Sequence, residues 1–598
     1  MPNILLKEKY NPKKAWVQTL TASKDKELIR KLALLNAINY SGKAQFQSVL
    51  GKLLTEKPDL KAKVREIAPE VTEIVEVVNK LSLEEQEREV KAKWPEALVK
   101  EKVEVEKRLP PLPNVEKYKQ VVTRFSPNPD CVLHLGSARA IILCYEYAKM
   151  YNGLFYLRFE DTDPRLKRAQ LSFYDLIRED LEWLGCKWDA EFIQSDRLPI
   201  YYKYTEKLLA DGNAYVCTCK PSDFRKTVHA KQACPCRVLP ANEQLSRWRN
   251  MLDGTYGEGE AVVRVKTDLK HPNPAVRDWP ALRIIDAEKY PHPRVESKYR
   301  VWPLYNLACG IDDHLLGITH IIRGKEHLTN QKRQEYMYRH LGWEYPEAIH
   351  YGRMKITGAT LSKSKIVQGV REGNFTGWDD PRLATFIALR KRGITPEAIR
   401  RLIIDVGPKP VDVTLSWENL YAYNRKIIDS AANRYFFVQD PRRIAVKNVS
   451  HAVTAKVPLH PDKPEKGFRQ FQVKPENKEA SLWISSHDVN IAKNKKIVRL
   501  MSLFNVQIEN VAKGVVEAVY HSASHEQARK LGAPLIHWVP VDTGLPCEVV
   551  MSNASIARGI AEDGCRELKA DDTVQFERFG FVKVESVNWK LKAYYAHR

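Results

Sequence analysis

The chain has 598 residues, of which 43% are apolar and 28% are charged. At roughly 150 residues per domain this length predicts three to five domains, and the composition excludes a mainly disordered, collagenous or disulfide-scaffold protein. The 96 Lys and Arg residues against 74 Asp and Glu residues give a net charge of +22, which favours a polyanionic partner, most often nucleic acid, over a basic surface kept for solubility.

No apolar run approaches the roughly 20 residues that a membrane span needs, and residues 1–14 contain no apolar signal-peptide core. Ten cysteines are too few for a secreted disulfide framework in a chain of this length. Four of them cluster at Cys217, Cys219, Cys234 and Cys236. This arrangement favours free thiols plus one metal site in a cytoplasmic protein without a membrane segment.

The first 114 residues predict a helical extension and a linker. Residues 25–37 are amphipathic, and between residues 59 and 107 charged residues alternate with Val, Ile and Leu at three- and four-residue steps. The Pro-rich stretch at 109–114 breaks any helix and is typical of a linker. We interpret the charged stretch as a solvated helical face rather than as a specific binding surface.

Residues 115–205 have the pattern of a parallel α/β unit. A strand is predicted at 121–125, a helix from Leu135 to about Ala148 and a second strand at 154–159, with Asn152-Gly153 closing the helix. Strand–helix–strand order predicts a parallel sheet whose ligands lie at its carboxyl edge.

The rest of the chain divides into regions that differ in their predicted secondary structure. Residues 206–300 predict an insertion rich in helices and loops that contains the clustered cysteines, and 301–370 the second half of the parallel-sheet core, including a strand-like run at 318–322. A helical subdomain is expected at 371–435. From 436 to 598, short alternating runs between Pro, Gly and Asn residues predict one or two antiparallel β-barrels.

Two segments carry chemistry, although neither a G-x-G-x-x-G nor a Walker motif is present. His134, Gly136 and Ser137 open the first predicted helix, where the helix dipole favours an anion, Gly136 allows close approach, and the imidazole can donate to an oxygen that gains charge. The basic segment Leu361-Ser-Lys-Ser-Lys365 can clamp a triphosphate. Taken singly, the first segment is more often a helix cap and the second a solvated loop.

Together the two segments resemble those of class I aminoacyl-tRNA synthetases, and within these the glutamyl/glutaminyl subgroup. The resemblance runs in the family's order from about residue 118 to 598, and its β-rich end is similar to the archaeal/eukaryotic branch. The segments that carry it are Arg124-Phe-Ser-Pro127, Arg158-Phe-Glu-Asp-Thr-Asp-Pro164, Trp302-Pro-Leu-Tyr305, Asp312-Asp313-His314, Ile322-Arg-Gly-Lys-Glu326, Gly377-Trp-Asp-Asp-Pro-Arg382 and Gln575-Phe-Glu-Arg-Phe-Gly580.

The resemblance implies a Rossmann-type catalytic core with an acceptor-binding insertion and anticodon-binding β-barrels. It implies that ATP, with Mg2+, and L-glutamate form glutamyl-adenylate, from which a glutamate-accepting tRNA takes the glutamyl group; whether glutamine tRNA is also charged stays open. By position, the implied catalytic residues are His134, Gly136, Ser137 and Lys363, and the implied ATP-binding residues are Pro127, His134, Gly136, Ser137, Ser362, Lys363, Ser364 and Lys365. Ser137 replaces the second histidine of the family's H-I-G-H motif, so its hydroxyl has a shorter reach toward ATP.

Glutamate carries one ammonium and two carboxylates, so its pocket needs two cationic contacts and one anionic contact. Arg124, Glu160 and Arg323 supply this set and match pocket positions of the family, as do Tyr305 and Ser126. Other roles stay open: Arg124 can be structural, Glu160 can pair with Arg158 or Arg165, and Arg323 can hold Glu326 or Asp312.

The four clustered cysteines supply enough thiolates for a structural zinc site, and the resemblance favours one in the insertion. Four reduced thiols in a loop are the alternative. For the whole chain the alternatives are a glutaminyl-tRNA synthetase, a nucleotidyltransferase that acts without tRNA, and a non-catalytic tRNA-binding relative. Against a glutaminyl enzyme stand Arg323 and the run Glu160-Asp-Thr-Asp163. A nucleotidyltransferase would explain neither the net charge nor the β-rich region. A non-catalytic relative would not need the intact His134 and Lys363.

Overall fold

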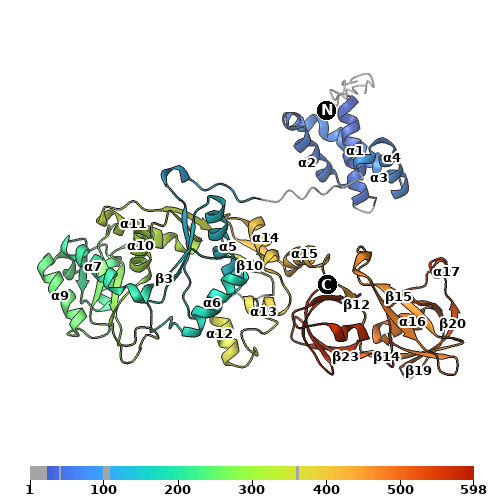
Figure 1. Ribbon diagram of the computed structural model, residues 1–598. Helices are drawn as coiled ribbons and strands as arrows, with labels where there is room; N and C mark the ends of the chain where they lie inside the picture. The colour runs from blue at the N-terminus through green and yellow to red at the C-terminus, as the bar shows by residue number, and fades with distance from the viewer. Residues whose placement is uncertain (1–22, 40–41, 98–107, 359–362, 513) are drawn as a thin grey trace, which may run out of the picture. The chain divides into compact units, whose positions relative to one another are not determined.

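The computed structural model describes residues 23–39, 42–97, 108–358, 363–512 and 514–598. It divides the chain into two compact units, Met1–Glu106 and Lys107–Arg598 (Figure 1). Among the described residues, no helix is both long and apolar enough to cross a membrane.

The first unit is helical, as its sequence predicted. Its α-helices share one apolar core, which includes Leu34, Val49, Val71 and Val90. Ser82 begins the last of them with a reciprocal capping box to Glu85, which satisfies two orphan backbone donors. The expected helical stretch at 98–107 lies outside the described residues. The helices are α1 (Ser23–Asn39), α2 (Phe46–Glu56), α3 (Val64–Asn79) and α4 (Leu83–Lys93).

The second unit begins with the predicted parallel sheet. Strands β1 (Val122–Phe125), β2 (Leu154–Phe159) and β3 (Ala190–Ile193) pair in parallel, with α5 (Leu135–Met150) connecting the first two and α6 (Leu171–Trp183) the next two. These bounds agree with the predicted strands and helix to within two residues, because long apolar runs define them.

A second parallel pair lies beside this sheet. Strands β8 (His320–Gly324) and β9 (Glu347–Tyr351) follow α10 (Tyr305–Leu315) and flank α11 (Leu328–Leu341). Thr319 joins this pair to β1, since its N–H donates to Val122 O at 3.0 Å and the Val122 N–H donates to its Oγ1 at 2.8 Å. The strand predicted at 318–322 is present as β8, but it begins and ends two residues later than predicted.

The insertion contains more β-structure than its sequence predicted. Its described residues form a four-stranded antiparallel sheet, which packs with the helices around Trp248, Trp279 and Trp302. The predicted helices are present, but the sheet was not predicted, because strands of three to five residues leave too little alternation to detect. The elements are α7 (Leu198–Ala210), β4 (Ala214–Cys217), α8 (Pro221–His229), α9 (Ala241–Asp253), β5 (Val262–Val265), β6 (Pro280–Ile284) and β7 (Val301–Pro303).

A helical subdomain connects the catalytic core to the C-terminal part. A short parallel pair, β10 (Met354–Ile356) with β11 (Val413–Leu415), brackets its first helices. The helices are α12 (Lys363–Arg371), α13 (Phe386–Lys391), α14 (Pro396–Val406) and α15 (Trp417–Ile428).

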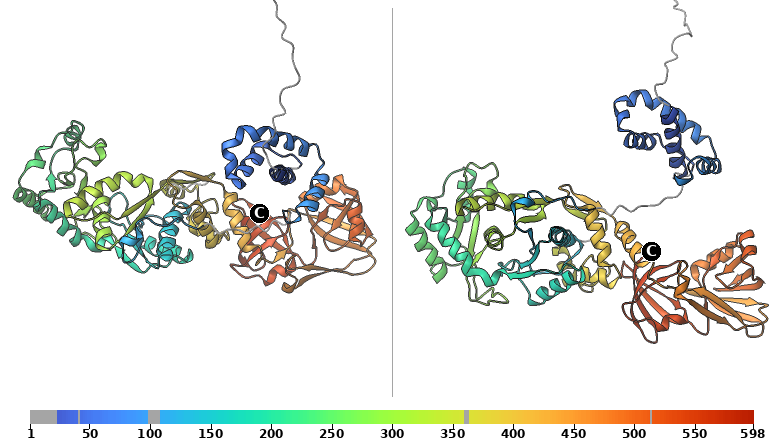
Figure 2. Two further views of the ribbon diagram at one scale, coloured as in Figure 1. Left: turned by 90° about the horizontal axis from the view of Figure 1, so that it is seen from above. Right: turned by 45° about the horizontal axis from the view of Figure 1, so that its top comes forward.

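The described C-terminal residues contain two curled seven-stranded sheets (Figure 2) and a hairpin of β15 (Val453–Pro458) and β16 (Phe468–Val473). One contains β12 (Arg434–Tyr435), β13 (Phe437–Gln439), β23 (Leu545–Val550), β24 (Ile556–Ala561), β25 (Thr573–Phe576), β26 (Gly580–Val587) and β27 (Leu591–His597). The other contains β14 (Pro441–Lys447), β17 (Glu479–Ser485), β18 (Ile497–Leu500), β19 (Asn505–Ala512), β20 (Val515–Ser522), β21 (Leu535–Ile536) and β22 (Val539–Pro540).

Each C-terminal sheet is mixed rather than purely antiparallel. β23 pairs with β27 in parallel, and so do β14 with β20 and β12 with β25, whereas most other pairs are antiparallel. The predicted antiparallel, β-rich architecture is confirmed, and a few parallel pairs that the sequence did not indicate are added to it. Alternation predicts that a strand exists, but long-range return of the chain decides which neighbour it pairs with.

Gly153 is required where β2 approaches β1. A Cβ atom there would lie 2.1 Å from Val121 O, a contact that backbone must move to relieve. We predict that Gly153→Ala lowers the free energy of unfolding by about 1–3 kcal/mol, as overpacking of a fitted site does. Urea denaturation measures the free energy of unfolding. Gly51→Ala is the control, because a Cβ at residue 51 would meet nothing within 4 Å. Equal stability of the two variants would contradict the prediction.

Candidate active site

His134 caps the helix that follows the first strand. It is the N-cap of α5, and its Nδ1 accepts a hydrogen bond from the Gly136 N–H at 3.0 Å. Burial lowers the pKa of this half-buried imidazole, which favours the neutral form. With Nδ1 accepting, the neutral ring carries its proton on Nε2 and can donate it to a ligand. The capping role and a role toward a phosphate are therefore compatible.

The other residues expected around ATP lie on both sides of this helix start. Gly136 and Ser137 form the first turn of α5, and the Ser137 N–H donates to His134 O at 2.7 Å. Pro127 is buried, and its carbonyl accepts from the Glu160 N–H at 2.8 Å. The turn that carries it is thereby fixed against the end of β2.

The basic segment is described in part. Ser362 lies outside the described residues, and Lys363 is described as the first residue of α12. Ser364 and Lys365 are exposed on the first turn of this helix. Ser364 lines an open recess of about 720 Å³ together with Asp130, Leu166, Lys167, Arg168, Val367, Gln368, Arg371 and Glu372.

Four charged groups form a compensated cluster at the sheet edge. Arg124 on β1 donates to both carboxylate oxygens of Asp313, at 3.0 and 3.1 Å. Arg158 on β2 donates to Asp313 at 2.7 Å and to Glu160 at 3.0 Å. Burial alone would raise the pKa of Asp313, but Arg124 and Arg158 hold it well below its usual range. Burial raises the pKa of Glu160, and Arg158 opposes that shift.

Arg323 on β8 has a different environment. Its side chain is 5% exposed, and it donates to Tyr345 Oη at 2.9 Å, Gln334 Oε1 at 3.2 Å and Tyr305 Oη at 3.4 Å. Its Nε also lies 3.4 Å from His350 Nε2, and burial and the charge of Arg323 lower the pKa of His350 to about 4.

The charge of Arg323 is therefore left uncompensated. Its partners are all neutral, and no carboxylate of the described residues forms an ion pair with it. Asp312, one of the alternatives for it, instead accepts from Arg197 and Tyr201. Because burying an unpaired cation is costly, this guanidinium favours an anionic ligand.

The sequence expectations for this pocket named Tyr305 but did not assign a pocket role to several other residues. Tyr305, Cys309 and Asp313 follow one another at four-residue steps on α10, so they share one helix face. Cys309 Sγ lies 3.2 Å from Arg158 Nη2, and burial raises the pKa of this thiol to about 11. The four-residue spacing was a usable signal for Cys309 and Asp313, whereas Tyr345, in the loop before β9, and His350, on β9, had no such signal.

Among the buried polar atoms without a hydrogen-bond partner in the described residues, two belong to residues that are next to Phe125 and Tyr305 in the sequence. Ser126 Oγ and Asn306 Oδ1 are buried and make no hydrogen bond within the described part of the chain. Ser126 follows β1, and Asn306 lies beside Tyr305 at the start of α10. Buried polar atoms are nearly always paired in native proteins, so these two are available to a ligand.

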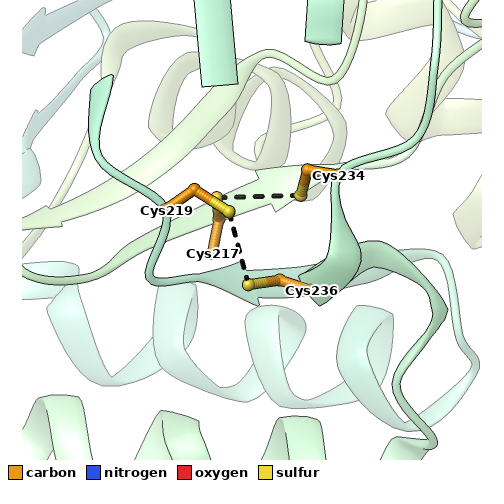
Figure 3. Close-up of side chains that lie close together, drawn as sticks. All are labelled: Cys217, Cys219, Cys234 and Cys236. Atoms are coloured by element: carbon orange, nitrogen blue, oxygen red, sulfur yellow. Dashed lines mark hydrogen bonds between the residues drawn. The ribbon is translucent and has the colours of Figure 1, made fainter. Parts of the chain in front are cut away.

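The four clustered cysteines converge on one point of the insertion (Figure 3). Cys217 Sγ lies 3.9 Å from Cys234 Sγ, and Cys219 Sγ lies 3.8 Å from Cys236 Sγ. All four sulfur atoms lie within 4.8 Å of one another. The hydrogen bond from Cys217 to Cys234 lowers the pKa of Cys234 and raises the pKa of Cys217, so it favours a thiolate at Cys234 and a thiol at Cys217.

Comparisons with known proteins agree over nearly the whole chain. A family model described as "tRNA synthetases class I (E and Q), catalytic domain" matches residues 120–430, and two described as "tRNA synthetases class I (E and Q), anti-codon binding domain" match residues 432–523 and 535–585. The glutamate–tRNA ligases of Pyrococcus furiosus and Thermococcus kodakarensis are each 53% identical over 579 residues, covering 96% of this chain and 99% of their own.

A crystal structure of a glutamate tRNA ligase from Elizabethkingia meningosepticum is also similar. It is 22% identical, covers 53% of this chain and 71% of its own, and gives a TM-score of 0.39.

The parallel sheet, the histidine-capped helix at its carboxyl edge and the downstream basic segment define a class I aminoacyl-tRNA synthetase. Within that class, the family matches show that the chain belongs to the glutamyl/glutaminyl family.

The absence of a side chain at Gly136 leaves room for the imidazole of His134, the candidate catalytic histidine. A Cβ at residue 136 would lie 2.7 Å from His134 Cε1 and 2.8 Å from Nδ1, so the imidazole would have to move. A displacement of about 1 Å costs on the order of a hundredfold in rate. We predict that Gly136→Ala lowers kcat of ATP–pyrophosphate exchange at least tenfold.

Exchange kinetics of the folded variant measure this effect. Gly257→Ala is the control, because its Cβ would meet Glu260 only at 3.4 Å. An unchanged kcat in Gly136→Ala would show that the imidazole position does not matter to this step.

Proposed function

We propose that this protein attaches L-glutamate to tRNA through glutamyl-adenylate, releasing diphosphate and then AMP. The observation that carries the proposal is the buried Arg323, whose neutral partners leave its charge for a side-chain carboxylate. The names of the similar Pyrococcus and Thermococcus proteins support it independently.

In the first step the α-carboxylate of glutamate attacks the α-phosphate of ATP, and diphosphate leaves. His134 Nε2–H at the start of α5 would donate to the triphosphate, where the helix dipole also favours negative charge. Lys363 would neutralise the departing diphosphate. ATP would bring Mg2+ on its own phosphate oxygens, which such sites commonly use as metal ligands.

In the second step a ribose hydroxyl of the tRNA attacks the adenylate carbonyl. The new ester bond forms as the bond to the phosphate oxygen breaks, and AMP leaves with that oxygen. The hydroxyl proton passes to the departing phosphate or to water. Holding both reactants at the sheet edge would supply most of the rate enhancement of this step, because a bimolecular reaction becomes effectively unimolecular.

We propose a role in glutamate binding for each of the charged pocket residues. Arg323 would bind the side-chain carboxylate through two parallel hydrogen bonds, with Tyr305 Oη beside it. Glu160, which retains one contact to Arg158, would bind the ammonium group. Arg124 is already paired with Asp313, so it contributes positive potential and orientation at the α-carboxylate rather than a free charge.

Glutamine is the competing substrate. Its side-chain amide has one acceptor and presents an NH2 group that opposes the donors of Arg323. Leaving a donor or charge unpaired in a closed pocket costs about 1–3 kcal/mol. The glutamyl assignment is therefore favoured over the glutaminyl one.

We predict that Arg323→Cys lowers glutamate kcat/KM in pyrophosphate exchange at least a hundredfold while glutamine loses much less. The measurement is exchange kinetics with both amino acids at saturating ATP and tRNA. Arg339→Cys is the matched control, since Arg339 is exposed on α11 beside Tyr336. A parallel loss with both amino acids would mean that Arg323 is structural and that this pocket does not select glutamate.

We propose that the two seven-stranded C-terminal sheets are the part of the chain that recognises tRNA. A recess of about 280 Å³ is lined from both matched anticodon-binding regions, by Arg434, Val457, Pro458, Pro461, Met501, Ser502, Gln575, Glu577 and Arg578. Arg578 is held in place by Asp488, with N···O distances of 2.6 and 2.9 Å. We propose that this recess receives an anticodon base, since amide and guanidinium groups read the edges of unstacked bases.

We propose further that the four cysteines hold one structural zinc ion. Zinc–sulfur bonds of about 2.3 Å in a tetrahedron place the sulfurs about 3.8 Å apart, close to the 3.9 and 3.8 Å between the two cysteine pairs. The Thr218 N–H and Arg247 Nη1 donate to Cys236 Sγ at 3.5 and 3.4 Å, which would support a bound thiolate.

Protein purified without chelator is predicted to contain one zinc ion per chain by elemental analysis. Cys234→Ser should lose the zinc and lower the thermal stability, whereas Cys186→Ser should retain it because Cys186 is buried in the catalytic core, away from the cluster. Four freely titrating thiols and no bound metal in the unaltered protein would remove the zinc proposal.

A further inference from the structure

His134 is held from outside its own helix. The Leu135 N–H donates to Ala384 O at 2.8 Å and the Phe386 N–H donates to Leu133 O at 3.1 Å, so the residues around His134 pair antiparallel with those around Thr385. Thr385, which pairs with His134 in this bridge, is the N-cap of α13 (Phe386–Lys391). Whatever fixes α13 therefore fixes the backbone of His134.

The other end of α13 is attached to the last strand of the chain. Arg392, the C-cap of α13, is 2% exposed and donates to Ala596 O at 2.9 Å and to Tyr595 O at 3.3 Å on β27. It also donates to Tyr421 Oη at 2.7 Å, and its guanidinium lies over the ring of Trp417.

Two more side chains strengthen this attachment. Lys583 Nζ on β26 donates to Arg390 O at 3.1 Å. The Asn424 Nδ2 of α15 lies 3.0 Å from Gly393 O and 2.9 Å from His597 Nε2, so it bridges the turn after α13 to β27. The seven residue steps from Thr385 to Arg392 span only about 10 Å of helix.

Arg392 is unusual for a buried cation. Its hydrogen-bond partners are carbonyl and hydroxyl groups, and no carboxylate of the described residues pairs with it. A buried charge with neutral partners is costly, and a methionine or leucine would fill the same space without that cost. Its donors do what an apolar residue cannot do: they fix the helix end to two consecutive carbonyls of β27.

We propose that Arg392 is a positioning residue for His134. By fixing the end of α13 to β27, it holds the bridge at Thr385 and so keeps the imidazole where adenylate formation needs it. The C-terminal sheet thus contributes to the geometry of the first chemical step as well as to tRNA binding. The kinetic consequence rests on the proposed function, whereas the effect on the histidine itself does not.

Arg392→Met in the full chain tests the proposal by kinetics and by chemical labelling. We expect kcat of pyrophosphate exchange to fall at least tenfold, with KM for glutamate and Kd for tRNA changed less than twofold, because the glutamate pocket lies on β1, β2, β8 and α10. Arg392→Lys, which can still donate to one carbonyl, should recover part of the loss. Arg401→Met is the control, since Arg401 is exposed on α14 and pairs with Glu397.

Labelling by diethyl pyrocarbonate, read by mass spectrometry, reports on His134 directly. We expect its modification rate relative to the exposed His451 to rise severalfold in Arg392→Met and to stay unchanged in Arg401→Met. Lys583→Met, with a side chain at the edge of the same junction, should shift both readouts in the same direction by a smaller factor. It decides the question if Arg392→Met does not fold.

An unchanged kcat, or a lower kcat with unchanged His134 labelling, would overturn the proposal and leave Arg392 with a purely structural role. A parallel rise in KM for glutamate would also overturn it, because the defect would then extend to the whole pocket. If the unaltered chain shows no glutamate-dependent exchange, the proposed function fails, and the labelling comparison alone still decides whether Arg392 positions His134.

Discussion

The active site depends on how three buried guanidinium groups are compensated at the edge of one parallel sheet. Arg124 and Arg158 share Asp313, and Glu160 balances the remaining charge of that pair. Arg323 lies among neutral groups and keeps its charge. Burying a charge without an opposite charge is costly, so this difference between the arginines is the basis on which we propose that Arg323 binds an anion.

The geometry around that pocket depends on segments far apart in the chain. α10 supplies Asp313 to the arginines of β1 and β2, and Thr319 joins the second half of the sheet to the first. The insertion that lies between these halves in sequence therefore does not interrupt the site. It folds around its own aromatic core and carries the cysteine cluster.

The ATP side and the amino-acid side are built on different principles. The proposed glutamate pocket contains charged side chains that are fixed by one another, an arrangement that orients them at the cost of desolvation. The phosphate side uses a helix start and backbone groups, with His134 neutral and partly accessible. Such groups bind an anion without requiring a permanently buried cation, which suits a triphosphate that must arrive and partly depart.

The sequence by itself determined the parallel catalytic unit, the helical first unit and the β-rich end, because long apolar runs and regular alternation are local properties. It also named Arg124, Glu160 and Arg323 as candidates, since a substrate with one ammonium and two carboxylates needs those residue types, and His134 as a candidate for a phosphate at a helix start. Whether each of them acts on a substrate stays a prediction.

Only the tertiary structure decided how those groups are paired. The choice of Asp313 as the partner of Arg124, the neutral surroundings of Arg323 and the attachment of Arg392 to β27 all join residues that are distant in sequence. The short strands of the insertion and the parallel pairs of the C-terminal sheets were likewise invisible to alternation. Local patterns specify which face of an element is buried, whereas long-range packing specifies what that face meets.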